Sequence, residues 1–272
     1  MKIKCEALAL DLDGTLTNEK KKITPLTGNA IQAAMDRGIK VILASGRPAL
    51  GIKPTARVLR LYERGGFILA YNGGQMIDCK TDEVIFERLL PMEYYPKICS
   101  FARSAGLHAL TYDENGVVAE SDTAAYVMKE AYNNTIPIRK VERLEDAVTS
   151  PVVKFMIVGE PDKMAVALPA MQQAFSGRIN VFLSEPYFME LTYPGVEKAS
   201  ALKRLLEYLD VKQEGLIAIG DGLNDIPMLN FAGYAVAMGN AYDSVKEIAD
   251  YVTLSNEEDG IADFLERFVL TD

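Results

Sequence analysis

Two acidic clusters, far apart in the sequence, constrain what this chain can fold into. The first reads Asp-Leu-Asp-Gly-Thr at residues 11–15, and the second reads Gly-Asp-Gly-Leu-Asn-Asp at residues 220–225. Each follows a short apolar run, at residues 7–10 and 216–219. Runs of this length that end at Gly or Asp are typical of buried parallel strands followed by loops. Because sites in open α/β sheets lie beyond the carboxyl ends of the strands, both clusters fall where chemistry is expected.

The two clusters together predict a cation site. If neighbouring strands bring them together, one crevice holds up to four carboxylates, those of Asp11, Asp13, Asp221 and Asp225. Two unpaired carboxylates about 4 Å apart repel each other by about 4 kcal/mol at an effective dielectric constant of about 20. Such a site needs a cation, and ligands that are all oxygen favour a hard ion such as Mg²⁺.

Composition and charge narrow the class of protein. The chain of 272 residues is long enough for two domains. Its formal net charge of −9 argues against nucleic acid as a partner, since proteins that bind nucleic acid carry a basic face. No apolar run approaches the roughly 20 residues that a membrane-spanning helix needs. The N-terminus leads directly into the first predicted strand, which leaves no room for a signal peptide, and Cys5, Cys79 and Cys99 lack metal-ligand spacing. We therefore expect a cytoplasmic protein with reduced cysteines and no membrane partner.

The first 85 residues alternate between strand and helix signals. Apolar runs predict strands, separated by helical stretches, at residues 5–10, 40–44 and 67–70. The first helix is expected to begin at Thr24-Pro25 and to stop at Gly38. Asn-Gly-Gly at residues 72–74 predicts a hairpin-type turn. This alternation predicts an α/β fold with a doubly wound, mainly parallel sheet.

The middle of the chain changes character. Between residues 86 and 192 the strands follow one another more closely, and helices are predicted at residues 92–104, 123–132 and 162–175. We interpret this part as an α+β domain inserted into the first one. The helix–strand alternation then resumes, so the predicted core domain consists of residues 1–85 and 193–272.

The chain resembles the haloacid dehalogenase superfamily, because four of its segments match the ordered motifs of that superfamily. These segments are residues 11–15, residues 45–47, Lys198 and residues 220–225. The large insert between the second and third motifs makes the chain similar to the Cof-type sugar-phosphate phosphatases. The resemblance implies a Rossmann-like core with an inserted α+β cap domain. One departure is Ala199 after the lysine, where many relatives carry Gly; it should affect loop geometry more than chemistry.

The resemblance implies two catalytic aspartates. Asp11 is the candidate nucleophile, since a carboxylate that attacks phosphorus to form an aspartyl-phosphate splits hydrolysis into two easier displacements. Asp13 is the candidate general acid for the leaving alkoxide and then the base for the attacking water. Its backbone carbonyl is expected to ligate Mg²⁺, together with the carboxylates of Asp11 and Asp221.

The remaining motif residues are expected to bind the phosphoryl group or to orient the site. Ser45 and Lys198 join Asp11 and Asp13 in the predicted catalytic set, because their donors can stabilise charge on the phosphoryl oxygens. Asp225 is expected to orient the lysine or a metal-bound water. The full predicted phosphate-binding set is Leu12, Ser45, Gly46, Lys198 and Asn224.

We therefore expect a Mg²⁺-dependent phosphomonoesterase that acts on small phosphorylated metabolites, with sugar phosphates favoured. One alternative is a sugar phosphomutase of the same superfamily, which would return the phosphate to the substrate. Another is a non-catalytic, phosphate-responsive regulatory protein of receiver type. Receivers use an Asp nucleophile without a general acid two residues later, so Asp13 and the large insert argue against that alternative.

Overall fold

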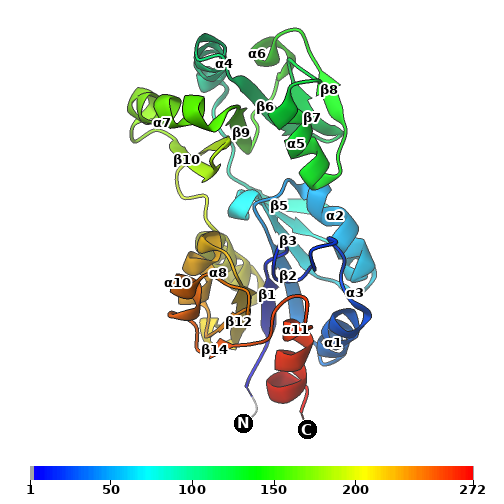
Figure 1. Cartoon of the computed structure of the whole chain (residues 1–272). Coiled ribbons are helices and arrows are strands. Elements are labelled where there is room, and N and C mark those ends of the chain that lie inside the picture. Colours follow the sequence, from blue (N-terminus) through cyan, green and yellow to red (C-terminus); the bar gives the residue numbers. More distant parts are fainter. Residues whose placement is uncertain (1–2, 272) are drawn as a thin grey trace. The chain divides into compact units, whose positions relative to one another are not determined.

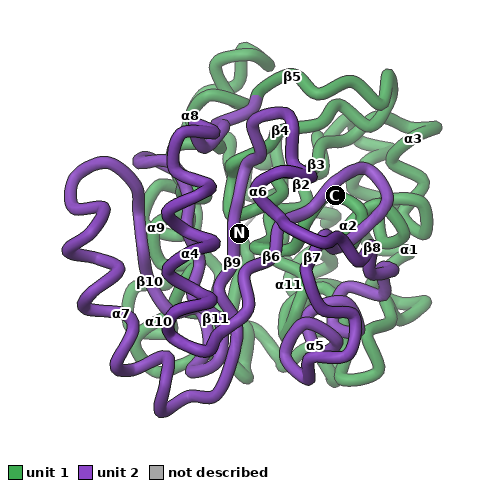
Figure 2. Tube along the Cα trace, turned by 90° about the horizontal axis from the view of Figure 1, so that it is seen from above, with its two compact units in different colours: residues 1–86, 197–272 green, residues 87–196 purple. Residues whose placement is uncertain are grey.

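The computed structural model describes residues 3–271, which form two compact units (Figures 1 and 2). Of the described residues, 3–86 and 197–271 form the first unit, and residues 87–196 form the second. Each unit has its own sheet and its own hydrophobic core. Within the described residues, no helix combines the length and the apolar character that a membrane crossing requires.

The first unit is built on an eight-stranded sheet in the order β14-β13-β12-β1-β2-β3-β4-β5. All pairs from β14 to β3 are parallel, and β4 is antiparallel to β3. This arrangement confirms the predicted α/β fold with a mainly parallel sheet. The strands are β1 (Ala7–Leu10), β2 (Lys40–Ala44), β3 (Phe67–Ala70), β4 (Gln75–Asp78), β5 (Glu83–Glu87), β12 (Leu216–Gly220), β13 (Tyr234–Ala237) and β14 (Tyr251–Val252).

Helices cover both faces of this sheet (Figure 1). On one face, α8 (Lys198–Leu209), α9 (Ile226–Phe231) and α10 (Asp243–Lys246) pack on alternate strand residues such as Ala9 and Ala218. The intervening strand residues point to the opposite face of the sheet, because successive side chains of a strand alternate. They are equally buried, so that face is covered as well. The other helices of the unit are α1 (Pro25–Asp36), α2 (Ala49–Val58), α3 (Leu61–Arg64) and α11 (Gly260–Phe264), which continues as a π-helix (Leu265–Val269).

Helix α1 begins and ends close to where its sequence predicts. The Thr24 hydroxyl accepts a hydrogen bond from the Thr27 amide at 3.2 Å, and Pro25 occupies the first helical position. At the other end, Gly38 has a φ of +85°, a conformation that glycine adopts without a steric penalty.

The second unit contains a six-stranded sheet in the order β10-β11-β9-β6-β7-β8, with α4 and α7 packed in its core. The strands are antiparallel except for the β7–β8 pair. Its elements are α4 (Tyr95–Ser104), β6 (His108–Asp113), β7 (Gly116–Ala119), α5 (Ala125–Asn134), β8 (Ile138–Lys140), α6 (Leu144–Ala147), β9 (Lys154–Val158), α7 (Pro161–Phe175), β10 (Asn180–Glu185) and β11 (Phe188–Thr192).

Two helices of the second unit start later than the sequence analysis placed them. The helix expected at 92–104 begins with a 3₁₀ turn, Met92–Tyr94, and becomes α-helical at Tyr95. Pro96 has no amide to donate to the Met92 carbonyl, so an α-helix cannot start at that carbonyl. The helix expected from residue 123 starts at Ala125. The amides of Thr123 and Ala124 donate to the Ser121 hydroxyl in a turn that precedes the helix.

Candidate active site

The two acidic clusters lie side by side because β1 and β12 are neighbouring parallel strands. Leu10 pairs with Ile219 in the sheet register, and the Asp11 amide donates to the Ile219 carbonyl at 3.1 Å. Asp11 directly follows β1, and Asp221 directly follows β12. The carboxyl ends of these strands therefore bring together segments from opposite ends of the chain.

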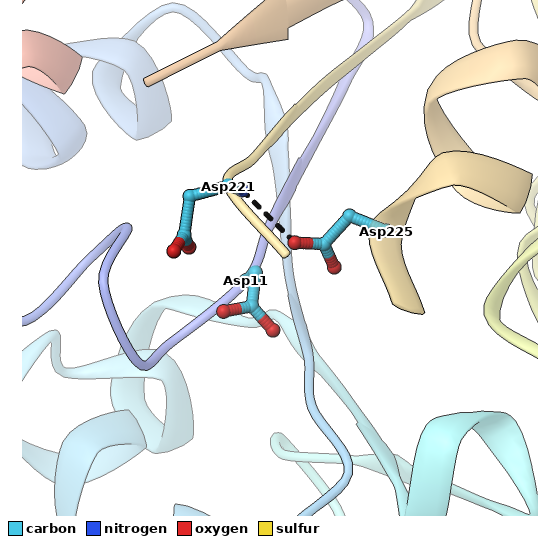
Figure 3. A group of neighbouring side chains, drawn as sticks. All are labelled: Asp11, Asp221 and Asp225. Carbon is cyan, nitrogen blue, oxygen red and sulfur yellow. Dashed lines mark hydrogen bonds between the residues drawn. The ribbon is translucent and has the colours of Figure 1, made fainter. Parts of the chain in front are cut away.

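Three carboxylates form one group at this edge of the sheet (Figure 3). Asp11, Asp221 and Asp225 each offer an oxygen within 4.8 Å of the others. Asp225 is fully buried, and its Oδ2 accepts hydrogen bonds from the amides of Asp221 at 3.0 Å and Gly222 at 2.8 Å. These bonds fix the loop that follows β12.

A buried lysine joins two of the three carboxylates. Lys198 is the first residue of α8 and is 1% exposed. Its Nζ donates to Oδ1 of Asp11 at 2.5 Å and to Oδ1 of Asp225 at 2.6 Å. Burial alone would lower the pKa of Lys198, but the negative charges of Asp11 and Asp225 outweigh burial and hold the pKa above its ordinary value. The lysine is therefore charged at neutral pH.

The group of carboxylates retains an excess of negative charge despite the lysine. Burial, followed by the charge of Asp225, raises the pKa of Asp11 well above its ordinary value, against the opposing effect of Lys198. Burial also raises the pKa of Asp221 to about 6, although the hydrogen bond from Thr15 opposes the shift. Carboxylate oxygens under mutual repulsion are the donors that a hard divalent cation prefers, so these residues fit a Mg²⁺ ion.

The loop after β1 is shaped around Asp221. Gly14 has a φ of +83°, and a Cβ atom at this position would lie 2.3 Å from Oδ2 of Asp221. The hydroxyl of Thr15 donates to Oδ1 of the same carboxylate at 2.6 Å. Position 14 therefore requires glycine for two reasons: the left-handed backbone and the space taken by the carboxylate.

Asp13 lies outside this group and forms ion pairs of its own. Nε of Arg47 donates to Oδ2 of Asp13 and Nη2 donates to Oδ1, both at 2.6 Å. The ammonium of Lys21 also bonds to Oδ1. Burial would raise the pKa of Asp13, but the two cations outweigh burial and hold the pKa below its ordinary value. Three of the four carboxylates thus lie in one group, and the fourth is neutralised separately.

The predicted phosphate-binding residues outside α8 lie in the segments that follow β1, β2 and β12. Leu12 is buried. Its carbonyl accepts hydrogen bonds from the amide of Thr17 at 2.9 Å and from the hydroxyl of Thr17 at 3.0 Å. Ser45 follows β2 and is 3% exposed, and its Oγ accepts from the Arg47 amide at 3.2 Å. Asn224 is exposed, in the loop that also carries Asp221 and Asp225. The phosphate-binding role of these residues stays a prediction.

The sequence analysis gave no role to several residues that contact the site. Arg47 belongs to the matched segment 45–47, and its place two residues after Ser45 is the available signal for it. Asn240 donates to the Gly14 carbonyl at 2.8 Å, and Asn72 accepts from Asn224 Nδ2 at 3.4 Å. Nothing in the sequence distinguishes Lys21 from the neighbouring surface lysines, since a turn with a φ of +57° brings it to Asp13.

Comparison with known proteins identifies relatives over nearly the whole chain. The family profile of the haloacid dehalogenase-like hydrolases matches residues 8–265. A 5-amino-6-(5-phospho-D-ribitylamino)uracil phosphatase of Bacillus subtilis is 28% identical over 264 residues, which cover 97% of this chain and 95% of the relative.

Two solved structures agree with these sequence matches. A haloacid dehalogenase-like hydrolase from Bacteroides thetaiotaomicron is 46% identical with a TM-score of 0.94, over 97% of this chain and 99% of that one. A sugar phosphatase of subclass IIB of the same superfamily is 27% identical with a TM-score of 0.77, over 98% of this chain and 100% of that one. Both likenesses extend over the inserted unit as well as the unit that carries the acidic clusters.

Proposed function

The chain belongs to the haloacid dehalogenase-like hydrolases and is a phosphatase of that family, and we propose that it hydrolyses small phosphorylated metabolites in a Mg²⁺-dependent reaction. One observation carries this proposal. Asp11 is buried at the end of the central strand, bonded to Lys198 and grouped with Asp221 and Asp225. A lone buried carboxylate would be costly, but one placed beside a cation and a metal site can serve as a nucleophile.

In the proposed reaction, a carboxylate oxygen of Asp11 attacks phosphorus and the alkoxide leaves, so that an aspartyl-phosphate forms. Water then attacks the phosphorus and regenerates the carboxylate. Lys198 is fixed by Asp11 and Asp225 before substrate arrives. Its ammonium therefore stabilises phosphoryl charge without reorganisation, and the positive N-terminus of α8 adds to the effect.

The carboxylates of Asp11 and Asp221 and the backbone carbonyl of Asp13 would hold Mg²⁺. The ion would supply positive charge that neutralises the phosphate oxygens during transfer. Asp225 is placed to act through other groups, since Lys198 occupies its Oδ1 and two amides occupy its Oδ2. We therefore keep Asp225 outside the proposed ligand set.

Asp13 is proposed as the general acid and base. Its lowered pKa supplies an ionised carboxylate, which suits the second step, in which a base takes a proton from the attacking water. For the first step Asp13 must carry a proton. An incoming phosphate competes for Arg47 and Lys21, which weakens the ion pairs that keep Asp13 ionised.

The phosphoryl group would be bound by donors from four chain segments. The Leu12 and Gly46 amides, the Ser45 hydroxyl, the Lys198 ammonium and the Asn224 carboxamide are the proposed donors. Their proximity to the ends of β1, β2 and β12 supports this assignment. Backbone amides of a loop that follows a strand commonly form such an anion-binding concavity.

We propose a sugar phosphate or a similar polyol phosphate as the substrate. Support comes from the solved sugar phosphatase and from the relatives named as phosphatases of a ribityl phosphate. The inserted unit, residues 87–196, is proposed as the cap that selects the leaving group. A cytoplasmic location is proposed as well, because Cys5, Cys79 and Cys99 are free thiols.

A phosphate-release screen tests the proposal. The full-length protein is incubated with a panel of phosphorylated metabolites in Mg²⁺ and, in parallel, in EDTA. We expect free phosphate from sugar phosphates in Mg²⁺ and loss of release in EDTA. Isomerised sugar phosphate without free phosphate would show a phosphomutase instead. Stable phosphorylation of the protein without turnover would show a regulatory protein. Release that EDTA leaves unchanged would contradict the metal requirement.

A further inference from the structure

The connection between β3 and β4 has a left-handed backbone conformation that is unfavourable for most of its residues. Tyr71, Asn72 and Gly73 have φ values of 54°, 56° and 94°. The left-handed region is disfavoured for residues with a Cβ atom, although Asn tolerates it better than most. Consecutive residues in this region persist only where the surroundings impose it, and such strain is frequent at functional sites.

The same connection is bonded to the loop that carries Ser45 and Gly46. The Asn72 amide donates to the Ser45 carbonyl at 2.8 Å, and the Tyr71 amide donates to the Arg47 carbonyl at 2.9 Å. A Cβ atom on Gly46 would lie 3.2 Å from Nδ2 of Asn72 and 3.3 Å from its Oδ1. The carboxamide of Asn72 therefore packs directly against Gly46.

Two further site segments meet this connection. Oδ1 of Asn72 accepts a hydrogen bond from Nδ2 of Asn224 at 3.4 Å. A Cβ atom on Gly73 would lie 2.5 Å from the Cβ of Ala201 and 2.9 Å from the Glu197 carbonyl, at the start of the helix that carries the site lysine. Three residues thus touch the second motif loop, the loop of the second acidic cluster and the N-terminus of α8.

We propose that Asn72 is a positioning residue of the phosphate site, which holds the Gly46 loop and the Asn224 side chain at the spacing that a phosphoryl group requires. The inference rests on the proposed function and adds to it a residue outside the four matched motif segments. A carboxamide suits this place because it is neutral. It accepts from one neighbouring donor and adds no negative charge next to a bound anion.

A purely structural role predicts different behaviour. If Asn72 only supports a left-handed turn, glycine should replace it without loss, because glycine adopts this backbone freely. Asn72→Gly therefore removes the carboxamide while it keeps the backbone. Asn72→Asp keeps the shape and the tolerance for the left-handed region, but it adds a charge. The matched control is Asp210→Gly, since Asp210 has a φ of 53° and caps the opposite end of α8.

The experiment measures the dissociation constant of inorganic phosphate by calorimetry in Mg²⁺, with kcat and KM for a phosphate ester and the melting temperature. For Asn72→Gly we expect phosphate binding about tenfold weaker and a raised KM, the effect of losing one hydrogen bond near a charged ligand. Asn72→Asp should bind phosphate more weakly still. Asp210→Gly should bind phosphate as the wild type does.

Two outcomes would overturn the positioning role. One is wild-type phosphate binding by Asn72→Gly, whether or not its melting temperature falls. This result would leave Asn72 with no role other than that of a turn residue. The other is wild-type binding by Asn72→Asp. Failure of the proposed function is separable, because phosphate binding is measured without turnover. A wild-type protein that binds phosphate but hydrolyses no ester would refute the phosphatase proposal alone, whereas one that binds no phosphate would refute both.

Discussion

Carboxylates gather around a basic residue in both units of this protein, with opposite electrostatic results. In the first unit, Lys198 bonds to Asp11 and Asp225, and the pKa of the neighbouring Asp221 rises to about 6. In the second unit, Arg103 bonds to Glu120 at 2.7 Å and to Glu145 at 2.6 Å. Its hydrogen bonds are the main reason why the pKa of Glu145 falls to about 2.

The difference separates a cluster whose charges are balanced from one in which carboxylates are in excess. The Glu145 cluster is balanced, because Arg143 also pairs with Glu145 at 2.5 Å, and the Arg103 side chain keeps 38% of its surface exposed. The first cluster places three carboxylates and one ammonium at a buried edge of the sheet. A protein that needed only stability would not bury such an imbalance, so the cluster is best explained by a ligand that completes it.

The largest expected effect is the loss of the nucleophile. Asp11→Asn keeps the size of the side chain but removes the attacking charge, and turnover should fall by at least about 10⁴-fold with the fold intact. Phosphate release and circular dichroism measure the two parts. Glu145→Gln, the corresponding neutralisation in the second unit, should leave turnover of para-nitrophenyl phosphate near the wild-type rate. Near wild-type release by Asp11→Asn would refute the covalent mechanism.

Asp13 differs from Asp11 and Asp221, because it is paired with Arg47 and Lys21 and its pKa is lowered. Asp13→Asn should slow the hydrolysis of a sugar phosphate by about 10²–10⁴-fold, since a poor leaving group needs a proton. The first step with para-nitrophenyl phosphate should slow less. The comparison needs saturating substrate and rate-limiting phosphorylation, which the absence of a burst of leaving-group release would show. Equal losses for both esters would contradict the acid role.

The two basic residues can be compared directly. Lys198→Met leaves Asp11 and Asp225 without their shared cation, and we expect kcat to fall by about 10²–10³-fold. Arg103→Met removes a partly exposed cation, so it should cost at most about 1 kcal/mol of stability and leave para-nitrophenyl phosphate turnover unchanged. Urea unfolding and initial rates measure both variants. An Arg103→Met enzyme that loses as much activity as Lys198→Met would remove the functional contrast between the clusters.

The sequence predicted the strands that carry the site better than the contacts within it. The apolar runs before Asp11 and Asp221 were sufficient to predict β1 and β12, because a strand buried on both faces is a continuous run of apolar residues. Edge strands β5 and β8 were missed, since charged residues such as Glu83 and Lys140 make them resemble loops. Their pairing comes from neighbouring strands and not from local pattern.

Within the site, the sequence predicts candidate residues for the chemistry but not how their side chains pair. The pairing of Asp13 with Arg47 depends on the loop geometry after two different strands, which no local spacing specifies. Asn72 was recognised only as part of a turn, because an Asn-Gly pair is a common turn signal. Its contacts with Gly46 and Asn224 depend on the tertiary fold.

The acidic cluster predicts an unusual pH dependence of stability. A carboxyl whose pKa is higher in the folded state binds its proton more tightly there, and its protonated form therefore stabilises the fold. For Asp221, this contribution to the free energy of unfolding is fully present below the unfolded pKa of about 4 and is lost as the pH rises through about 6. The raised pKa of Asp11 acts in the same direction. In EDTA, the melting temperature of the wild type should therefore fall between pH 4.5 and 7.5 relative to Asp221→Asn. Mg²⁺ should reverse this fall, because the ion binds the ionised carboxylates. Parallel curves for the two proteins would refute the role of Asp221.

The smallest expected effect lies in the second unit, and its sign is opposite. The pKa of Glu145 is about 2, below the ordinary 4.5, so its ion pairs contribute stability above the unfolded value and lose that contribution as pH falls from about 4.5 towards 2. Glu145→Gln should lower the free energy of unfolding by about 1 kcal/mol or less at pH 7 and by a vanishing amount near pH 2, since the ion pairs are partly exposed.

Glu142→Gln is the control, because Glu142 is exposed and lies three residues earlier in the same segment. Hydrogen exchange of amides in β6, β7 and α4 reports this unit alone and separates it from unfolding of the first. Equal protection in Glu145→Gln and wild type at pH 7, or a difference that grows as the pH falls, would show that the Arg103 cluster does not stabilise the insert.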